Sequence, residues 1–196
     1  MTPPDLVRGL APVLRALREL GVPHYVAGSL ASSLHGVPRA SIDADIVADL
    51  REPHGGPLCR ALEGLYYVPE ARVGMAIRER SSFNVIHLET IIKVGVFVSR
   101  DRPSDRRAFD RAEIATLDEG EGLQAPAASA EDTVIAKLEW YRKGGGVSER
   151  QWSDVIGVLR VSRDRLDLEY LRTGATELGL DALLVRALEA AAAGPR

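Results

Sequence analysis

The sequence contains a single cysteine, Cys59, among its 196 residues. One cysteine cannot form an intramolecular disulfide bond, and without clusters of cysteine and histidine we expect no structural zinc site. No apolar stretch approaches the length of a membrane helix, and charged and proline residues near the N-terminus interrupt any signal-peptide profile. We therefore expect a protein of a reducing, cytoplasmic setting that has no membrane partner.

Aromatic residues are also scarce, at 5% of the chain, and the 25 Lys and Arg residues are outnumbered by 28 Asp and Glu residues. So few aromatic rings argue against a stacking platform for single-stranded nucleic acid. The formal charge of -3 argues against a surface that binds nucleic acid over its whole extent, but it is compatible with a local basic patch. With 45% hydrophobic residues, the chain is apolar enough to form a folded core.

Sequence periodicity predicts a mixture of helices and strands in the first part of the chain. Apolar residues at helical spacing from Leu6 to Leu17 predict a first helix, and shorter helices are expected at about 30–34 and 54–64. Strand-like segments are expected at residues 24–27, 42–47, 83–88, 90–98 and 114–117. The segments 83–88 and 90–98 are close enough in sequence to pair as a hairpin.

The acidic, glycine-containing run 118–122 separates this part from a C-terminal part that we expect to be purely helical. Ser129 and Ser148 each begin a capping-box pattern that starts a helix, and two further helices follow. The sequence therefore predicts an α/β domain over residues 1–125 and a helical subdomain over residues 126–196.

Asp43 and Asp45 lie two positions apart on a predicted strand. Residues at this spacing project from the same face of a strand, and two carboxylate groups suit Mg²⁺, which completes its shell with water and substrate phosphates. Gly28 and Ser29 lie between a predicted strand and a helix, where a phosphate can approach the backbone and the helix N-terminus. Either motif alone is more often a solvated acidic pair or an ordinary turn, but together they predict a metal–triphosphate site.

These motifs resemble the nucleotidyltransferase superfamily of the DNA polymerase β type. Its signature is an apolar strand, Gly-Ser or Gly-Gly, a short helix and then Asp-x-Asp on the next strand. The segment YVAGSLASSLHGVPRASIDADIVADL carries the resemblance and is most similar to the bacterial minimal and AbiEii-toxin-like branches. The similarity continues to about residue 160 through FNVIHLETIIKVGVFV, AEDTVIAKLEW and SERQWSDVIGVL.

The resemblance implies an α+β fold, in which a nucleotidyltransferase-type mixed sheet is flanked by helices and followed by the helical subdomain. It also implies that Asp43 and Asp45 bind Mg²⁺ or Mn²⁺ and that Gly28 and Ser29 hold the triphosphate. Three further residues match nucleotide-binding positions of the family: Lys93, Lys137 and Asp154. Without the resemblance, a lysine or an aspartate on a helix surface would simply be expected to be solvated.

The sequence departs from the family pattern at Gly95, where the family has a third catalytic carboxylate. Either catalysis is weakened, or a neighbour such as Glu89 or Asp101 replaces the missing acid, or the residue was changed deliberately. Two carboxylates and the phosphate oxygens still suffice for one Mg²⁺, so we expect nucleotide binding more firmly than turnover.

The resemblance thus implies an enzyme that moves a nucleoside monophosphate from a nucleoside triphosphate to an acceptor hydroxyl on an RNA end, a protein or a small molecule. The toxin-like branch suggests tRNA or another RNA as the acceptor and a cognate antitoxin protein as a partner. The alternative is a non-catalytic nucleotide-binding or interaction protein that retains the fold.

The arginine-rich stretch 100–111 is expected to be a salt-bridged surface or a basic rim that guides an acceptor. Arg39 is expected either to pair with an acid or to reach a phosphate.

Overall fold

The computed structural model describes residues 4–118, 120 and 122–193. It divides into two compact units, which we call unit 1 (residues 1–30 and 40–127) and unit 2 (residues 31–39 and 128–196). The chain thus leaves unit 1 after residue 30, returns at residue 40 and leaves again after residue 127. The sequence suggests a single division of the chain at 125/126, and it does not predict that residues 31–39 belong to the second unit.

Unit 1 is built on a seven-stranded sheet with the order β3-β4-β5-β2-β1-β7-β6. The strands are β1 (His24–Ala27), β2 (Asp43–Ala48), β3 (Tyr66–Tyr67), β4 (Ser82–His87), β5 (Lys93–Val98), β6 (Glu113–Asp118) and β7 (Leu123–Ala127). The pairs β2–β5 and β1–β7 are parallel, and the other neighbours are antiparallel, including the predicted hairpin of β4 and β5. The predicted α+β class with a mixed sheet is confirmed.

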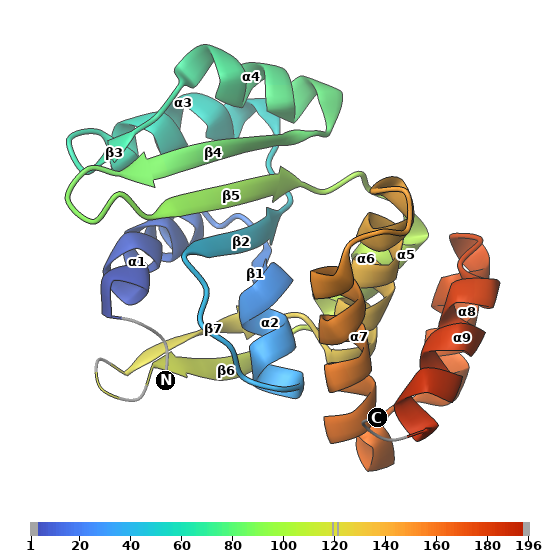
Figure 1. The fold of residues 1–196 in the computed structure, drawn as a ribbon. Coiled ribbons are helices and arrows are strands. Elements are labelled where there is room, and N and C mark those ends of the chain that lie inside the picture. Colours follow the sequence, from blue (N-terminus) through green and yellow to red (C-terminus); the bar gives the residue numbers. More distant parts are fainter. Residues whose placement is uncertain (1–3, 119, 121, 194–196) are drawn as a thin grey trace. The chain divides into compact units, whose positions relative to one another are not determined.

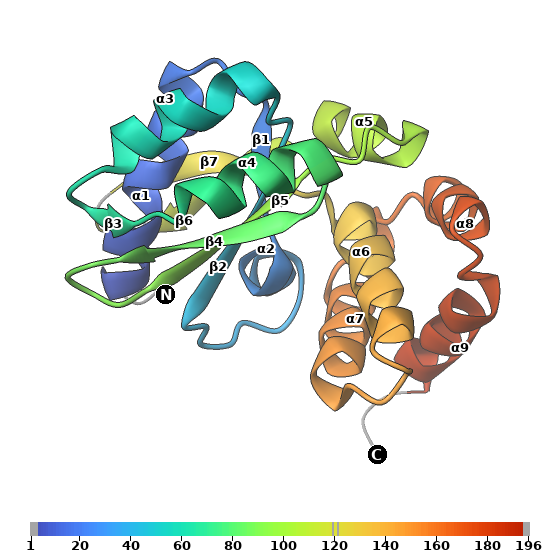
Figure 2. The same ribbon diagram turned by 90° about the horizontal axis from the view of Figure 1, so that it is seen from above.

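One face of this sheet is covered by helices. Helix α1 (Pro4–Glu19) packs against β2, β5 and β7, while α3 (Glu52–Leu62) packs between α1 and α4 (Glu70–Glu79) (Figure 1; Figure 2). The leucines that predict α1 from their spacing form its buried stripe, and they are at most 1% exposed: Leu6, Leu10, Leu14 and Leu17. On β2, buried Ala44 and Ile46 alternate with half-exposed Asp43 and Asp45, so the two carboxylates face away from α1.

Several elements of unit 1 have weak sequence signals and were not predicted. Strand β7 has the sequence LQAPA, which contains no β-branched residue and includes Pro126, yet it pairs with both β1 and β6. The expectation of a purely helical chain after residue 122 is therefore wrong for residues 123–127. Helix α5 (Pro103–Asp110) lies within the arginine-rich stretch, where charge hides the helical pattern, and α4 and the two-residue β3 were also missed.

Unit 2 is helical, as predicted for the C-terminal part. Its helices are α6 (Ala130–Lys143), α7 (Glu149–Val161), α8 (Leu168–Glu177) and α9 (Asp181–Ala192), with the 3₁₀ turn η1 (Arg163–Arg165) after α7 (Figure 1). The side chain of Ser129 accepts a hydrogen bond from the backbone of Asp132 at the start of α6, and Ser148 caps α7 in the same way. No helix within the described ranges is long and apolar enough to cross a membrane.

Residues 31–39 belong to unit 2 because they pack on α7. The first five of them, 31–35, belong to helix α2 (Gly28–His35), and the carbonyl oxygen of His35 accepts a hydrogen bond of 2.8 Å from Ser162 Oγ. A Cβ atom at Gly36 would lie 2.8 Å from the backbone nitrogen of Val158, so only glycine permits this approach. The turn that follows α2 is thereby fixed to the helical unit.

Candidate functional site

The predicted carboxylate pair lies in the middle of the sheet of unit 1. Asp45 on β2 is the register partner of Ala27 on β1 and of Gly95 on β5, and Asp43 is the partner of Lys93. Asp43 and Asp45 both belong to the face of β2 that α1 does not cover. The strand geometry therefore brings together the two predicted metal ligands, the Gly-Ser turn after β1 and the position of the missing carboxylate.

Asp45 is flanked by a glycine on each side. A Cβ atom at Gly28 would lie only 2.1 Å from Asp45 Oδ2, and one at Gly95 would lie 2.9 Å from Asp45 Oδ1. Gly28 also has a φ of +62°, in the left-handed region that glycine adopts most readily. The Asp45 side chain thus occupies space that a larger residue at position 28 would take, which gives Gly28 a structural role beside its predicted phosphate-binding role.

This packing predicts that Gly28→Ala destabilises the protein by about 1–3 kcal/mol, because the new methyl group combines an unfavourable φ with a clash against Asp45. Gly21→Ala is a matched control, since Gly21 has a φ of +66° but no atom of the described residues within 4 Å of its Cβ position. Urea denaturation of both variants isolates the contribution of the clash. Equal destabilisation of the two variants would contradict the packing of Asp45 on Gly28.

A chain of hydrogen bonds holds Ser29 to the start of β2. Ser41 Oγ donates to the carbonyl oxygen of Asp43 at 2.8 Å, and Ser29 Oγ lies 2.6 Å from Ser41 Oγ. Because the single hydroxyl proton of Ser41 is used by Asp43, Ser29 must be the donor in the second bond. The Ser29 hydroxyl therefore fixes the Gly-Ser turn beside the carboxylate strand, and a phosphate-binding role for Ser29 relies on the backbone and the N-terminus of α2.

Lys93 forms an ion pair with one of the two carboxylates. Its Nζ atom lies 3.3 Å from Asp43 Oδ2, and both side chains are close to half exposed. Such an exposed pair contributes little to stability, since water screens it. The ion pair matters for the charge of the site, because the ammonium group of Lys93 partly neutralises Asp43.

Neither Glu89 nor Asp101 replaces the missing carboxylate. Glu89 lies in the turn before β5 and is ion-paired with Arg8, while Asp101 follows β5 and is ion-paired with Arg51 and Arg106. Among the residues that the structure describes, no group of three or more Asp, Glu, His or Cys side chains is placed to hold a metal ion. The hypothesis of a substitute acid is therefore wrong for these two residues.

Asn84 lies at the same site, although it was not predicted from the sequence. Asn84 on β4 is the register partner of Gly95, and its Oδ1 atom lies 3.5 Å from the position that a Cβ at residue 95 would take. An asparagine in a strand carries no recognisable sequence signal. Only the pairing of β4 with β5 reveals its neighbourhood.

Lys137 and Asp154, the two remaining predicted nucleotide-binding residues, meet inside unit 2. Lys137 Nζ lies 2.6 Å from Asp154 Oδ2, and both side chains are only 7% exposed. Arg39 completes the cluster with hydrogen bonds of 2.9 Å from Nε and Nη2 to the two oxygens of Asp154. Burial alone would raise the pKa of Asp154, but the hydrogen bonds from Arg39 and Lys137 outweigh it and lower this pKa. Arg39 thus pairs with an acid, the first of the two roles that its sequence left open.

No protein-family model and no curated protein matches the sequence. The fold nevertheless occurs in solved structures. The antibiotic-resistance factor ANT(2'')-Ia in solution has a TM-score of 0.53 and 13% identity, over 90% of this chain and 92% of its own. ANT(2'')-Ia in complex with adenylyl-2''-tobramycin has a TM-score of 0.54 and 13% identity, over 86% and 94%. An antigenic nucleotidyltransferase-like protein from Paracoccidioides brasiliensis has a TM-score of 0.51 and 15% identity, over 96% and 94%.

The chain has the nucleotidyltransferase fold. This result agrees with the resemblance that Gly28, Ser29, Asp43 and Asp45 suggest in the sequence. The roles of the individual site residues stay predictions.

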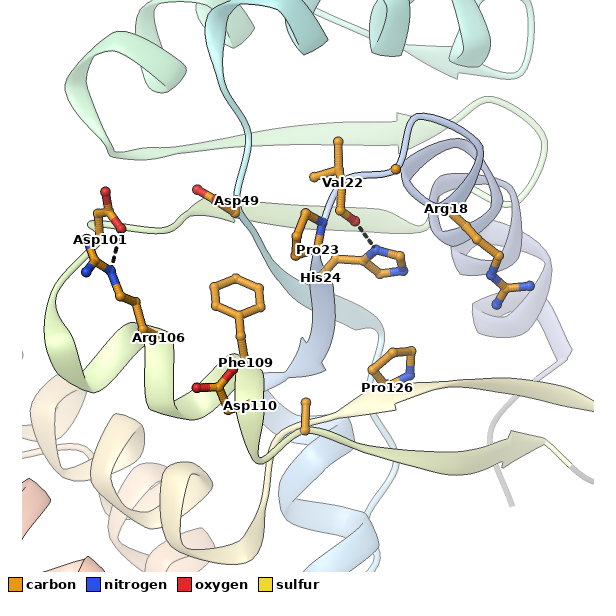
Figure 3. Close-up of a pocket in the computed structure, with 12 residues that line it drawn as sticks. Arg18, Val22, Pro23, His24, Asp49, Asp101, Arg106, Phe109, Asp110 and Pro126 are labelled. Carbon is orange, nitrogen blue, oxygen red and sulfur yellow. Dashed lines mark hydrogen bonds and ion pairs between the residues drawn. The ribbon is translucent and has the colours of Figure 1, made fainter.

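Unit 1 also has an open pocket of about 760 Å³ at the other end of β1 (Figure 3). It is lined by His24 at the start of β1, by Asp49 after β2 and by Phe109 of α5, whose ring packs edge-on against Tyr25. None of the residues predicted to bind metal or nucleotide lines it, since Asp45 pairs with Ala27 at the opposite end of the strand. This pocket is therefore separate from the carboxylate pair of Asp43 and Asp45.

The surroundings of His24 in this pocket favour its neutral form. Its Nδ1 atom lies 2.7 Å from the carbonyl oxygen of Val22, and its buried Nε2 atom has no hydrogen-bond partner among the residues described. Burial lowers the pKa of His24 below its ordinary value of 6.5, and the nearby charge of Arg18 acts in the same direction. A proton on Nε2 would be a buried donor with no acceptor.

The lowered pKa of His24 predicts a loss of folding stability in mild acid. As the pH falls below about 6.5, histidine in the unfolded chain binds a proton before His24 in the folded chain does, so the unfolded state is favoured. Thermal melts at about pH 7.5 and about pH 5.5 test this, and His24→Gln should lose less stability between the two values than the wild type. An unchanged acid sensitivity of this variant would show that His24 is not the responsible group.

Proposed function

We propose that this chain is a nucleotidyltransferase that moves a nucleoside monophosphate from a nucleoside triphosphate to an acceptor hydroxyl, at a rate limited by the missing third carboxylate. The observation that carries the proposal is the position of Asp45, packed between Gly28 and Gly95 and beside the N-terminus of α2. The nucleotidyltransferase fold supports it, since ANT(2'')-Ia, which shares this fold, is seen with adenylyl-2''-tobramycin.

The side chains at this site fit one Mg²⁺ or Mn²⁺ ion. Asp43 and Asp45 are both half exposed on the same face of β2, and Mg²⁺ in nucleotide sites is commonly held by one or two carboxylates together with substrate phosphates and water. A bound ion would neutralise charge on the triphosphate and orient the α-phosphorus for in-line attack. Lys93 balances Asp43 in the absence of nucleotide, and a phosphate group would offer its ammonium group another anionic partner.

The N-terminal end of α2 would position the triphosphate, and Gly95 is the position at which the site lacks a carboxylate. The N-terminal end of α2, held through Ser29 and Ser41, directs its positive dipole towards an anion. In the reaction, the acceptor oxygen bonds to the α-phosphorus, the bond from the α-phosphorus to the bridging oxygen breaks, and pyrophosphate leaves. At Gly95 there is no carboxylate to take the proton from the acceptor hydroxyl, so this proton must pass to solvent or to a phosphate oxygen.

The possible classes of acceptor are supported by different observations. A small-molecule hydroxyl is favoured by the adenylyl-2''-tobramycin complex of ANT(2'')-Ia. An RNA end such as that of tRNA, a protein hydroxyl, a toxin-like role and a cognate antitoxin stay predictions from the sequence resemblance. Nucleotide-binding roles for Lys137 and Asp154 are likewise proposed on the resemblance alone.

A second candidate function is that of a non-catalytic nucleotide-binding protein. Gly95 favours it, because loss of a catalytic acid affects turnover more than binding. The ion pair between Lys93 and Asp43 also favours it, since it reduces the negative charge available to a metal ion.

A transfer assay separates these candidates. The protein is incubated with each ribonucleoside triphosphate labelled at the α-phosphate, with Mg²⁺ and a set of aminoglycoside, RNA and protein acceptors. Transfer of the label to the acceptor is measured together with the release of pyrophosphate, which carries the unlabelled β- and γ-phosphates. We expect slow release that requires Mg²⁺ and is absent in the double variant Asp43→Asn/Asp45→Asn. Triphosphate binding without release would support the non-catalytic candidate, and release that persists in the double variant would contradict the proposed site.

A further inference from the structure

Three side-by-side strands place Asn84, Gly95 and Asp45 in one row across the sheet. A Cβ atom at residue 95 would lie 2.9 Å from Asp45 Oδ1 and 3.5 Å from Asn84 Oδ1. Both side-chain oxygens therefore border the same point, and they are no farther apart than the sum of these two distances. A side chain at residue 95 would occupy the point that both oxygens border.

We propose that Asn84 supplies the third protein oxygen of the metal site, in place of the carboxylate that is missing at residue 95. This inference rests on the proposed function, since it concerns the same ion that Asp43 and Asp45 would hold. Amide carbonyl oxygens are ligands of hard cations, as carboxylate oxygens are. Asn84 is exposed on β4, so its side chain can turn towards the ion, and it is the only asparagine in the sequence.

The chemistry of an amide separates two roles that one carboxylate would combine. The Oδ1 atom of Asn84 can coordinate a cation, but an amide cannot take up a proton as a carboxylate does. Asn84 is also neutral, and Lys93 offsets part of the charge of Asp43, so the site carries less negative charge than one with three acids. The structure thus assigns this site metal binding through three oxygens without a general base.

Titration with Mn²⁺ alone tests this assignment without reference to activity. The electron paramagnetic resonance signal of free Mn²⁺ reports how much metal each full-length variant binds. We expect Asn84→Ala to weaken Mn²⁺ binding by about tenfold or more, and Asn84→Asp, which adds a negative charge, to bind more tightly than the wild type. Gln124→Ala is the matched control, because Gln124 is an exposed amide on β7 of the same sheet, and its loss should leave the affinity unchanged.

Including Asp45→Asn distinguishes failure of this inference from failure of the proposed function. If Asp45→Asn abolishes binding while Asn84→Ala binds like the wild type, the metal site exists without Asn84. In that case the inference about Asn84 is overturned and the proposed function is not. If Asp45→Asn binds like the wild type, or if the wild type binds no Mn²⁺, both the metal site and the role of Asn84 are overturned. Both variants change exposed or half-exposed side chains, so unchanged thermal melts are expected to verify that the fold is intact.

Discussion

Gly95→Asp is expected to raise the rate of nucleotidyl transfer by about 10²–10⁴-fold, the usual contribution of a general base. Residue 95 pairs with Asp45 in the sheet, so the new carboxylate would lie beside the proposed metal ligand. The closest atom to the new Cβ is Asp45 Oδ1, at 2.9 Å, and this oxygen is the end of a side chain that can rotate away. Pyrophosphate release under saturating Mg²⁺ and triphosphate measures the effect.

The control for this prediction is Gly95→Asn, which adds a side chain of the same shape without a carboxylate. It should leave the rate near that of the wild type. The aspartate variant should also gain more thermal stability from Mg²⁺ than the wild type does, since metal relieves the repulsion between the new carboxylate and Asp45. Equal rates for the aspartate and asparagine variants would show that position 95 is not where the acceptor proton is taken up.

Asp154→Ala is expected to lower the free energy of unfolding by about 3–5 kcal/mol, because it leaves the buried charge of Lys137 without its carboxylate partner. Arg39 loses its bidentate partner in the same variant. Since the pKa of Asp154 is lowered from 3.8, its contribution is present above that pH and is lost as the pH falls through the lowered value. Urea denaturation near neutral pH measures the effect.

Two further variants show whether charge burial is the cause. Asp164→Ala removes an exposed aspartate of the same unit, and it should change stability by no more than about 0.5 kcal/mol. The double variant Lys137→Met/Asp154→Leu removes both buried charges, and it should recover most of the lost stability. A loss below about 1 kcal/mol for Asp154→Ala would contradict a desolvated ion cluster.

The parts of the fold that could be predicted are those in which a local pattern and burial agree. The spacing of Leu6, Leu10, Leu14 and Leu17 predicts α1 because these side chains form the stripe that meets the sheet. Strand β7 could not be predicted, because Leu123–Ala127 is stabilised by pairing with β1 and β6 rather than by the propensities of its residues. The excursion of residues 31–39 into unit 2 also depends on contacts between distant residues, such as those of His35 with Ser162.

The candidate site shows the same division between local and long-range information. The Asp43–Asp45 pair and the Gly28–Ser29 turn are local motifs, and the pairing of β1 with β2 brings them together as expected. That residue 95 lies beside Asp45 is implied by the family resemblance, and the β2–β5 register places it there. The role of Asn84 depends on a third strand, and the partnership of Arg39 with Asp154 joins residues 115 positions apart, so neither was visible in a single sequence.

The metal–triphosphate site is tested most directly by calorimetric titration of the wild type and of Asp45→Asn with α,β-methylene-ATP and the corresponding analogues of the other ribonucleotides, with and without Mg²⁺. We expect that at least one analogue binds the wild type, that this binding is strengthened by Mg²⁺, and that the strengthening disappears in Asp45→Asn. Binding that is the same in both proteins, or that is indifferent to Mg²⁺, would contradict a metal–triphosphate site on this strand.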